Sequence, residues 1–105
     1  MTAPRQTTGT LTVTRGPDAG RGFDIGATTV TIGRYGECDI QVRDTWVSRW
    51  HARVSWNGIE YIIEDLGSTN FTRVNKNKLV SHTPQVLNHD DEIQLGRIIL
   101  KFYVG

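Results

Sequence analysis

Short runs of alternating apolar and polar residues fill the chain, and turn-forming residues separate them. In residues 10–15 the apolar side chains Leu11 and Val13 lie two positions apart, and residues 51–56 repeat this spacing. A period of two is typical of a β-strand with one buried face. No window of about twelve residues sustains the 3.6-residue period of an amphipathic helix. The pattern therefore predicts an all-β chain.

Turn signals divide this pattern into about eleven short strands. Asn57-Gly58 is the strongest hairpin signal, residues 16–20 form a turn that contains Gly and Pro, and Gly96-Arg97 marks a tight reversal. Strands at this spacing favour a β-sandwich or barrel whose functional residues lie in loops at one rim. The predicted strands cover residues 10–15, 21–25, 28–33, 39–43, 51–56, 60–65, 72–75, 78–80, 85–87, 91–95 and 98–103.

Composition narrows the classes of function. A length of 105 residues fits one domain, which we place at residues 10–105 after a flexible lead-in over residues 1–9. A formal net charge of +1 argues against binding of nucleic acid through bulk charge. No apolar run approaches the ~20 residues of a membrane span, and the start lacks an apolar signal core. A single cysteine, Cys38, gives no sign of an oxidising compartment, so we expect a cytoplasmic protein.

Three loops between predicted strands carry side chains that suit an oxyanion. Arg34 lies in residues 33–38, Ser48 and Arg49 lie in residues 44–51, and Thr69 and Asn70 lie in residues 65–72. Guanidinium, hydroxyl and amide groups all donate hydrogen bonds, and a phosphate dianion needs several converging donors with at least one cation. The loops therefore predict an anion-binding rim.

Structural and catalytic alternatives exist for the same residues. Arg34 taken alone fits a solvated loop residue paired with Glu37. Ser48 and His51 suggest a nucleophile and a base, but residues three apart in an extended segment point to opposite faces. The three histidines share no spacing typical of metal ligands. We therefore expect no enzyme, no metal and no cofactor.

The order of these motifs resembles the forkhead-associated (FHA) domain family. The segments GRYGECDIQVRD, VSRWHARV, LGSTNFTRVN and LNHDDEIQLGRIILKF follow the family's Gly-Arg, Ser-x-x-His, Ser-Thr-Asn and Asp-x-Ile-x-Leu-Gly order. The likeness runs from about Leu11 to Val104, and the segments RGPDAG and IILKFYVG look like those of small actinobacterial FHA regulators. The resemblance implies an eleven-stranded β-sandwich that binds a phosphothreonine peptide at one rim, without catalysis.

The resemblance also implies roles for particular loop residues and a class of partner. It assigns Arg34, Ser48, Arg49 and Thr69 to the phosphate, Asn70 to the peptide backbone, Trp46 to the third residue after the phosphothreonine, and Gly33, His51 and Asn75 to loop support. Ser68 either caps its turn or touches the ligand. The implied partner is a phosphothreonine-containing protein, either a Ser/Thr kinase or its substrate. We expect a monomer that binds neither nucleic acid nor membrane.

Phe71 departs from the family's pattern, which has Gly at this position. Gly suggests a positive φ, which a bulky residue adopts at a cost of about 1–2 kcal/mol. Either the loop is remodelled or Phe71 is strained. With Trp46, Phe71 predicts a preference for an apolar residue after the phosphothreonine. The departure also leaves open a second function, a phosphorylation-independent scaffold or self-assembly module.

Thr7, Thr8 and Thr10 are candidate phosphorylation sites, because some small FHA regulators close on their own amino-terminal phosphothreonine. Here only a few residues precede the first predicted strand. Each residue spans at most about 3.5 Å, so closure within one chain is implausible, and binding in trans stays open. The simpler interpretation is an unstructured lead-in.

Overall fold

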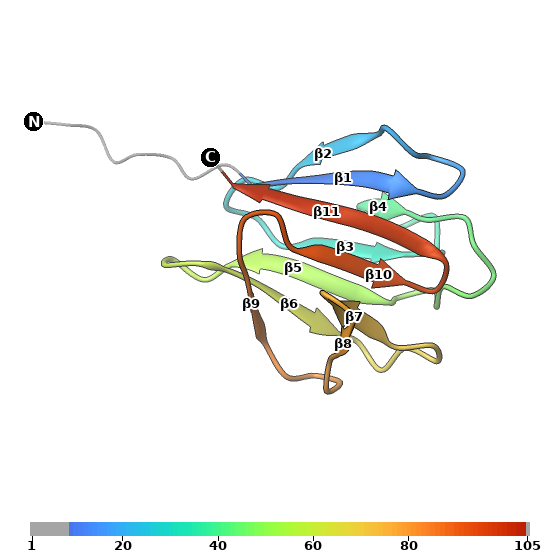
Figure 1. Cartoon of the computed structure of the whole chain (residues 1–105). Coiled ribbons are helices and arrows are strands. Elements are labelled where there is room, and N and C mark those ends of the chain that lie inside the picture. The colour runs from blue at the N-terminus through green and yellow to red at the C-terminus, as the bar shows by residue number, and fades with distance from the viewer. Residues whose placement is uncertain (1–8, 105) are drawn as a thin grey trace, which may run out of the picture.

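The computed structural model describes residues 9–104, which form two packed β-sheets with no helix between these bounds (Figure 1). The strands are β1 (Gly9–Arg15), β2 (Gly22–Asp24), β3 (Val30–Gly33), β4 (Ile40–Gln41), β5 (Ala52–Trp56), β6 (Tyr61–Asp65), β7 (Thr72–Val74), β8 (Asn77–Lys78), β9 (Gln85–Leu87), β10 (Glu92–Leu95) and β11 (Ile98–Val104). The prediction of an all-β sandwich of eleven strands is confirmed.

The two sheets differ in strand number and pairing. Six strands pair in the order β2-β1-β11-β10-β7-β8, and five strands pair in the order β4-β3-β5-β6-β9. Every pair is antiparallel except β3 and β4, where Ile32 lies beside Ile40 in a parallel register. Within residues 9–104 no helix has the length and hydrophobicity that a bilayer crossing requires.

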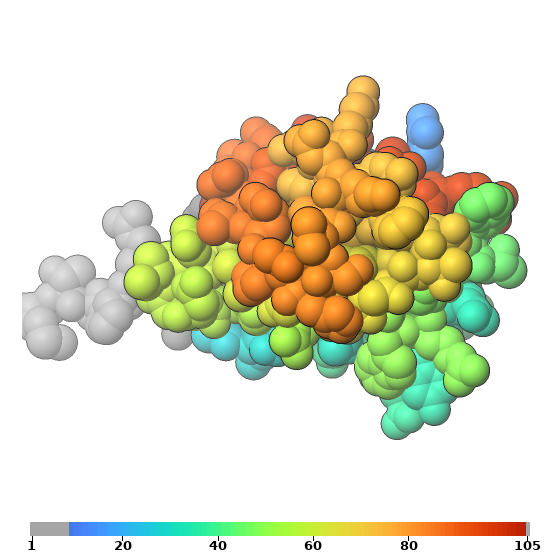
Figure 2. Space-filling view, turned by 90° about the horizontal axis from the view of Figure 1, so that it is seen from below, coloured from blue at the N-terminus to red at the C-terminus, as the bar shows by residue number. Residues whose placement is uncertain are grey.

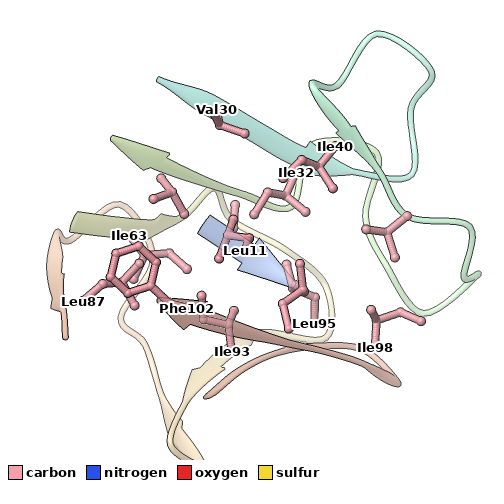
Figure 3. Close-up of a cluster of buried hydrophobic side chains, with 14 of the residues drawn as sticks. Leu11, Val30, Ile32, Ile40, Ile63, Leu87, Ile93, Leu95, Ile98 and Phe102 are labelled. Carbon is pink, nitrogen blue, oxygen red and sulfur yellow. The ribbon is translucent and has the colours of Figure 1, made fainter. Parts of the chain in front are cut away.

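The core lies between the inner faces of the two sheets. Leu11 and Phe102 from the six-stranded sheet face Ile32 and Ile63 from the five-stranded sheet, and all four side chains are fully buried (Figure 3). The strands show the alternation that the sequence predicts, with buried positions two residues apart in β1 and β6. This core holds the strand ends in place, and the loops extend from them.

Strand boundaries agree with the prediction to within two residues, and three of the differences have a visible consequence. β1 begins at Gly9, which we assigned to the lead-in, because its buried N–H donates to the Tyr61 hydroxyl at 2.9 Å. β8 covers Asn77 and Lys78 rather than residues 78–80, since Asn75 and Lys76 adopt positive φ angles of 50° and 72°. These angles form a two-residue hairpin turn. β4 is shorter than predicted, and residues 1–8, with Thr7 and Thr8, lie outside the described residues.

Four loops meet at the end of the sandwich where β11 begins, opposite its carboxyl end (Figure 1). They follow β3, β4, β6 and β10, so segments far apart in sequence become neighbours. In the space-filling view, the green segment near residues 44–50 lies beside the yellow segment near residues 66–72 (Figure 2). All three polar loops predicted from the sequence lie at this rim.

Candidate functional site

A groove of about 350 Å³ crosses the rim and contains the five residues predicted to bind phosphate and peptide backbone. It is lined by Arg34, Ser48, Arg49, Thr69 and Asn70, together with Thr45, Trp46 and Val47. Arg34, Arg49 and Thr69 are exposed, and Ser48 and Asn70 are half-buried. The fold therefore brings together donors from three loops that are far apart in the sequence.

Arg34 is fixed against the loop that follows β4. Its backbone N–H donates to the Ser48 carbonyl at 2.9 Å, and its side-chain Nε donates to the Val47 carbonyl at 3.0 Å. No ion pair joins it to Glu37 among the described residues, so the solvated-pair interpretation does not describe this arginine. The bond through Nε ties the guanidinium to this loop, and Arg34 and Arg49 both line the groove.

Gly33 allows the two arginine loops to approach each other. A Cβ at this position would lie 2.0 Å from the Arg49 carbonyl oxygen, a distance that no side chain tolerates. The same carbonyl accepts from the Tyr35 N–H at 3.2 Å and from the Cys38 thiol at 3.1 Å. Burial raises the pKa of the Cys38 thiol, which favours a structural role over a reactive one.

His51 joins the loop of Ser48 to the loop of Phe71 and is fully buried. Its Nδ1 accepts from the Ser48 N–H at 3.0 Å, so Nε2 carries the hydrogen and donates to the Phe71 carbonyl at 2.9 Å. Burial holds the pKa of His51 below its ordinary value of 6.5, although the bond to Phe71 opposes the shift. The neutral ring therefore has a structural role, in which it links two loops, rather than the role of a general base.

Ser48, Thr69 and Asn70 are linked across the groove. The Thr69 N–H donates to Ser48 Oγ at 3.0 Å, and Asn70 Nδ2 donates to the Trp46 carbonyl at 2.9 Å. Because Ser48 Oγ accepts in this bond, its own hydroxyl hydrogen stays available to a ligand. The side chains of Arg49 and Thr69 make no hydrogen bond within the described residues. Ser48, Arg49 and Thr69 thus offer available donors to one groove.

Asp65 organises the loop that carries Thr69 and Asn70. Its fully buried carboxylate accepts from the hydroxyls of Ser68, Thr72 and Ser81 and from the backbone N–H of Gly67 and Ser68. Burial alone would raise the pKa of Asp65, but these hydrogen bonds outweigh it and lower the pKa. Ser68 is thus turned inward toward Asp65, as the capping interpretation predicts.

Phe71 adopts a left-handed backbone conformation, which is strained for a bulky residue. Its φ is 67°, and its carbonyl still receives the hydrogen bond from His51. Of the two possibilities that the sequence left open, the strained residue is the one observed. Phe71 and Trp46 are 40% and 51% exposed and line a second, more apolar groove of about 480 Å³ next to the first.

Asn75 supports a different loop from the other candidates. Its side chain donates to Asp91 at 2.8 Å and accepts from the Glu92 N–H at 3.0 Å, which ties the β7–β8 turn to the start of β10. Within residues 9–104 no three histidine, cysteine or carboxylate side chains gather as metal ligands would.

Asp44 is a structural residue that the sequence interpretation missed. It is buried and accepts from the Trp46 N–H, the Arg97 N–H and the Arg97 side chain, the last at 2.7 Å. The hydrogen bond from Arg97 lowers the pKa of Asp44. Arg97 lies 53 positions away in the sequence, so no local pattern predicts the pair.

Comparison with known proteins assigns the family. The FHA domain family model matches residues 30–96, and the fold and the order of loops agree with it, so this chain belongs to the FHA domain family. A solved FHA domain from a study of phosphothreonine-dependent FHA domain interactions superposes with a TM-score of 0.81 at 30% identity. That superposition covers 91% of this chain and 95% of the other.

Curated relatives are small regulators from actinobacteria, as the resemblance indicated. The oxoglutarate dehydrogenase inhibitor of Corynebacterium efficiens is 44% identical over 95 residues, covering 90% of this chain and 65% of the relative. The glycogen accumulation regulator GarA of Mycolicibacterium smegmatis is 40% identical over 95 residues, covering 90% and 58% respectively. The chain thus spans less than two thirds of the length of these relatives.

Proposed function

We propose that this chain is a phosphothreonine-dependent binding module that acts in Ser/Thr kinase signalling. The observation that carries the proposal is the convergence of two guanidinium groups and two hydroxyls on one exposed groove of an FHA domain. A phosphate dianion is recognised by such a set of charge-assisted hydrogen bonds. Net charge near zero does not oppose this, because a single phosphate needs local charge and not global charge.

In this proposal each groove residue has one role. Arg34 and Arg49 supply charge to the phosphate, and the hydroxyls of Ser48 and Thr69 donate to its oxygens. Asn70 holds the peptide backbone beside the phosphorylated residue. Charge-assisted bonds contribute about 1.5–3 kcal/mol each, so three or four of them, less the ordering cost, are compatible with micromolar affinity. Micromolar affinity corresponds to about −8 kcal/mol.

The second groove supports a preference for the residues that follow the phosphothreonine. Trp46 lines both grooves, and Phe71, which is 40% exposed, lines the second. An apolar side chain that covers these rings gains roughly 25 cal/mol per Å² of apolar surface removed from water. A phosphopeptide library without apolar enrichment downstream of the phosphothreonine counts against this preference.

The proposed partner is a phosphothreonine-containing protein, either a Ser/Thr kinase or its substrate. The names of the relatives, an inhibitor of oxoglutarate dehydrogenase and a regulator of glycogen accumulation, favour a regulator of metabolism over an enzyme. We further propose that the chain is a monomeric cytoplasmic module and that it performs no catalysis. The alternative function, a scaffold or self-assembly module, differs from this proposal in that its binding does not depend on phosphorylation.

Substitution of Arg34 tests the proposal. Arg34→Ala removes one phosphate donor, and we expect it to weaken phosphopeptide binding at least tenfold, which is about 1.4 kcal/mol. Arg53→Ala is the matched control, because Arg53 lies on β5 and pairs with Glu64 at 3.3 Å, outside the groove. Fluorescence anisotropy measures both. Equal affinity of Arg34→Ala and wild type would show that the groove is not the phosphate site.

A further inference from the structure

The loop that joins β8 to β9 is exposed, yet it contacts the base of the loop that carries Thr69. Residues 80–84 are all exposed, and in Figure 2 this orange segment lies beside the yellow segment near residues 66–72. The Ser81 hydroxyl donates to Asp65 Oδ2 at 2.7 Å, and the His82 N–H donates to the Asp65 carbonyl at 2.8 Å. An exposed loop is thus tied to a fully buried carboxylate.

The Ser81 hydroxyl shares one carboxylate oxygen with the backbone of the Thr69 loop. Asp65 Oδ2 also accepts from the N–H of Gly67 at 3.0 Å and from the N–H of Ser68 at 3.1 Å. The lowered pKa of Asp65 keeps the carboxylate ionised at neutral pH. Among residues 9–104 Asp65 forms no ion pair, so hydrogen-bond donors alone balance its charge. A change at Ser81 that replaces the donor with negative charge therefore acts directly on this loop.

The β8–β9 loop is held by few contacts and includes one strained residue. His82 has a φ of 60°, and its ring packs so closely that a Cβ at Gly67 would lie 3.3 Å from His82 Nε2. Residues 79–84 belong to neither sheet. Exposed segments with few buried contacts open locally at a small cost in free energy. Such opening gives an enzyme access to the Ser81 hydroxyl.

We propose that Ser81 is a phosphorylation site whose modification weakens binding in the groove of Arg34, Ser48 and Thr69. A Ser/Thr kinase transfers the γ-phosphoryl group of ATP to Ser81 Oγ. The Oγ–P bond forms, the bond from this phosphorus to ADP breaks, and the hydroxyl proton passes to the base of the kinase. This inference rests on the proposed phosphothreonine function.

The modification reverses the electrostatics at Asp65. A hydroxyl that donates to the carboxylate becomes a group with a charge of about −1.5 to −2. Two like charges at hydrogen-bond distance repel each other, so the β8–β9 loop leaves Asp65. The Thr69 loop then loses the support that the β8–β9 loop gives it through Asp65. Thr69 and Asn70 are consequently less well ordered for a ligand.

Phosphoserine inserted at position 81 during translation tests this effect on the whole chain. We expect Ser81→phosphoserine to bind a phosphothreonine peptide at least tenfold more weakly in fluorescence anisotropy, and phosphatase treatment to restore the affinity. Thr83→phosphoserine is the matched control, because Thr83 lies in the same loop and its hydroxyl donates to the Ser81 carbonyl rather than to Asp65. The control should bind within about twofold of wild type. An equal loss in both variants, or no loss at position 81, overturns the inference.

Amide hydrogen exchange without peptide separates this inference from the proposed function. The N–H groups of Gly67 and Ser68 should exchange at least tenfold faster in Ser81→phosphoserine, and less so in Ser81→Ala, which removes a donor without adding charge. Unchanged exchange at both groups overturns the effect of the modification alone. Equal binding of phosphorylated and unphosphorylated peptides by the unmodified chain overturns the proposed function, whatever the exchange rates.

Mass spectrometry tests whether Ser81 accepts phosphate. The chain is incubated with ATP and the catalytic domain of an actinobacterial Ser/Thr kinase, and the modified residues are mapped. We expect phosphate at Ser81, and Ser81→Ala should remove that site from the map. Phosphorylation confined to other residues overturns the assignment of Ser81.

Discussion

His51 is the residue whose replacement most sharply separates support of the site from contact with ligand. His51→Ala removes the acceptor of the Ser48 N–H and the donor to the Phe71 carbonyl. A buried backbone group left without a partner costs about 1–3 kcal/mol, and because both bonds are only partly buried we take about 1–2 kcal/mol for each. The free energy of unfolding should therefore fall by about 2–4 kcal/mol.

Two amide variants each keep one of the two hydrogen bonds and so separate their contributions to this loss. The Asn side chain reaches the position of Nδ1 and the Gln side chain reaches the position of Nε2. His51→Asn should therefore keep the bond to Ser48, and His51→Gln should keep the bond to Phe71, each at about half of the loss. Urea unfolding followed by tryptophan fluorescence measures the free energies, and the phosphopeptide affinity of the folded variant is measured in parallel. A fall of less than about 1 kcal/mol in the free energy of unfolding of His51→Ala would refute the structural role of His51.

Three further predictions concern backbone geometry and pH. Gly33→Ala should destabilise the fold by at least about 1–3 kcal/mol in chemical unfolding, because its Cβ would overlap the Arg49 carbonyl. Phe71→Gly should be more stable than Phe71→Ala by about 1 kcal/mol, the reverse of the usual order, since φ is 67° there; equal stabilities contradict the strain. Stability should fall as pH drops below 6.5, because the lowered pKa of His51 means that the unfolded chain takes up the proton first, and His51→Gln should remove this slope.

The loss of folding stability at more acidic pH, here called the acid limb, has a separate origin. The pKa of Asp65 is lowered in the folded protein, so the stability it supplies is present above its unfolded pKa and is lost as pH falls through the folded one. Asp65→Asn should remove this part of the acid limb in a series of unfolding curves. It should also loosen the loop of Thr69, because an amide cannot accept from the Ser68, Thr72 and Ser81 hydroxyls as a carboxylate does.

The strands and the site loops were predictable for different physical reasons. Alternation marks the longer strands, such as β1 and β6, because one face of each sheet meets the core. The loops are recognisable because hydrogen-bond donors such as Arg34 and Thr69 cluster between strands. Trp56 and Tyr61 flank the predicted hairpin and do pack together, with ring centroids 5.0 Å apart.

Long-range pairings were not predictable, because no local pattern encodes them. The pair of Asp44 and Arg97 joins residues 53 positions apart, and the bond from Gly9 to Tyr61 spans 52. That bond also explains why β1 begins one residue earlier than alternation predicts. The backbone of Phe71 was ambiguous for the same reason, since its strain is held by the distant His51.

A titration with three matched peptides tests the phosphothreonine proposal. The peptides carry Thr, phosphothreonine or phosphoserine in one sequence, and anisotropy or calorimetry gives their affinities for the whole chain. We expect micromolar binding of the phosphothreonine peptide, no measurable binding of the Thr peptide, and at least about fivefold weaker binding of phosphoserine, since one buried methyl is worth roughly 1 kcal/mol. Equal affinities for the Thr and phosphothreonine peptides would contradict the proposal and favour the phosphorylation-independent scaffold.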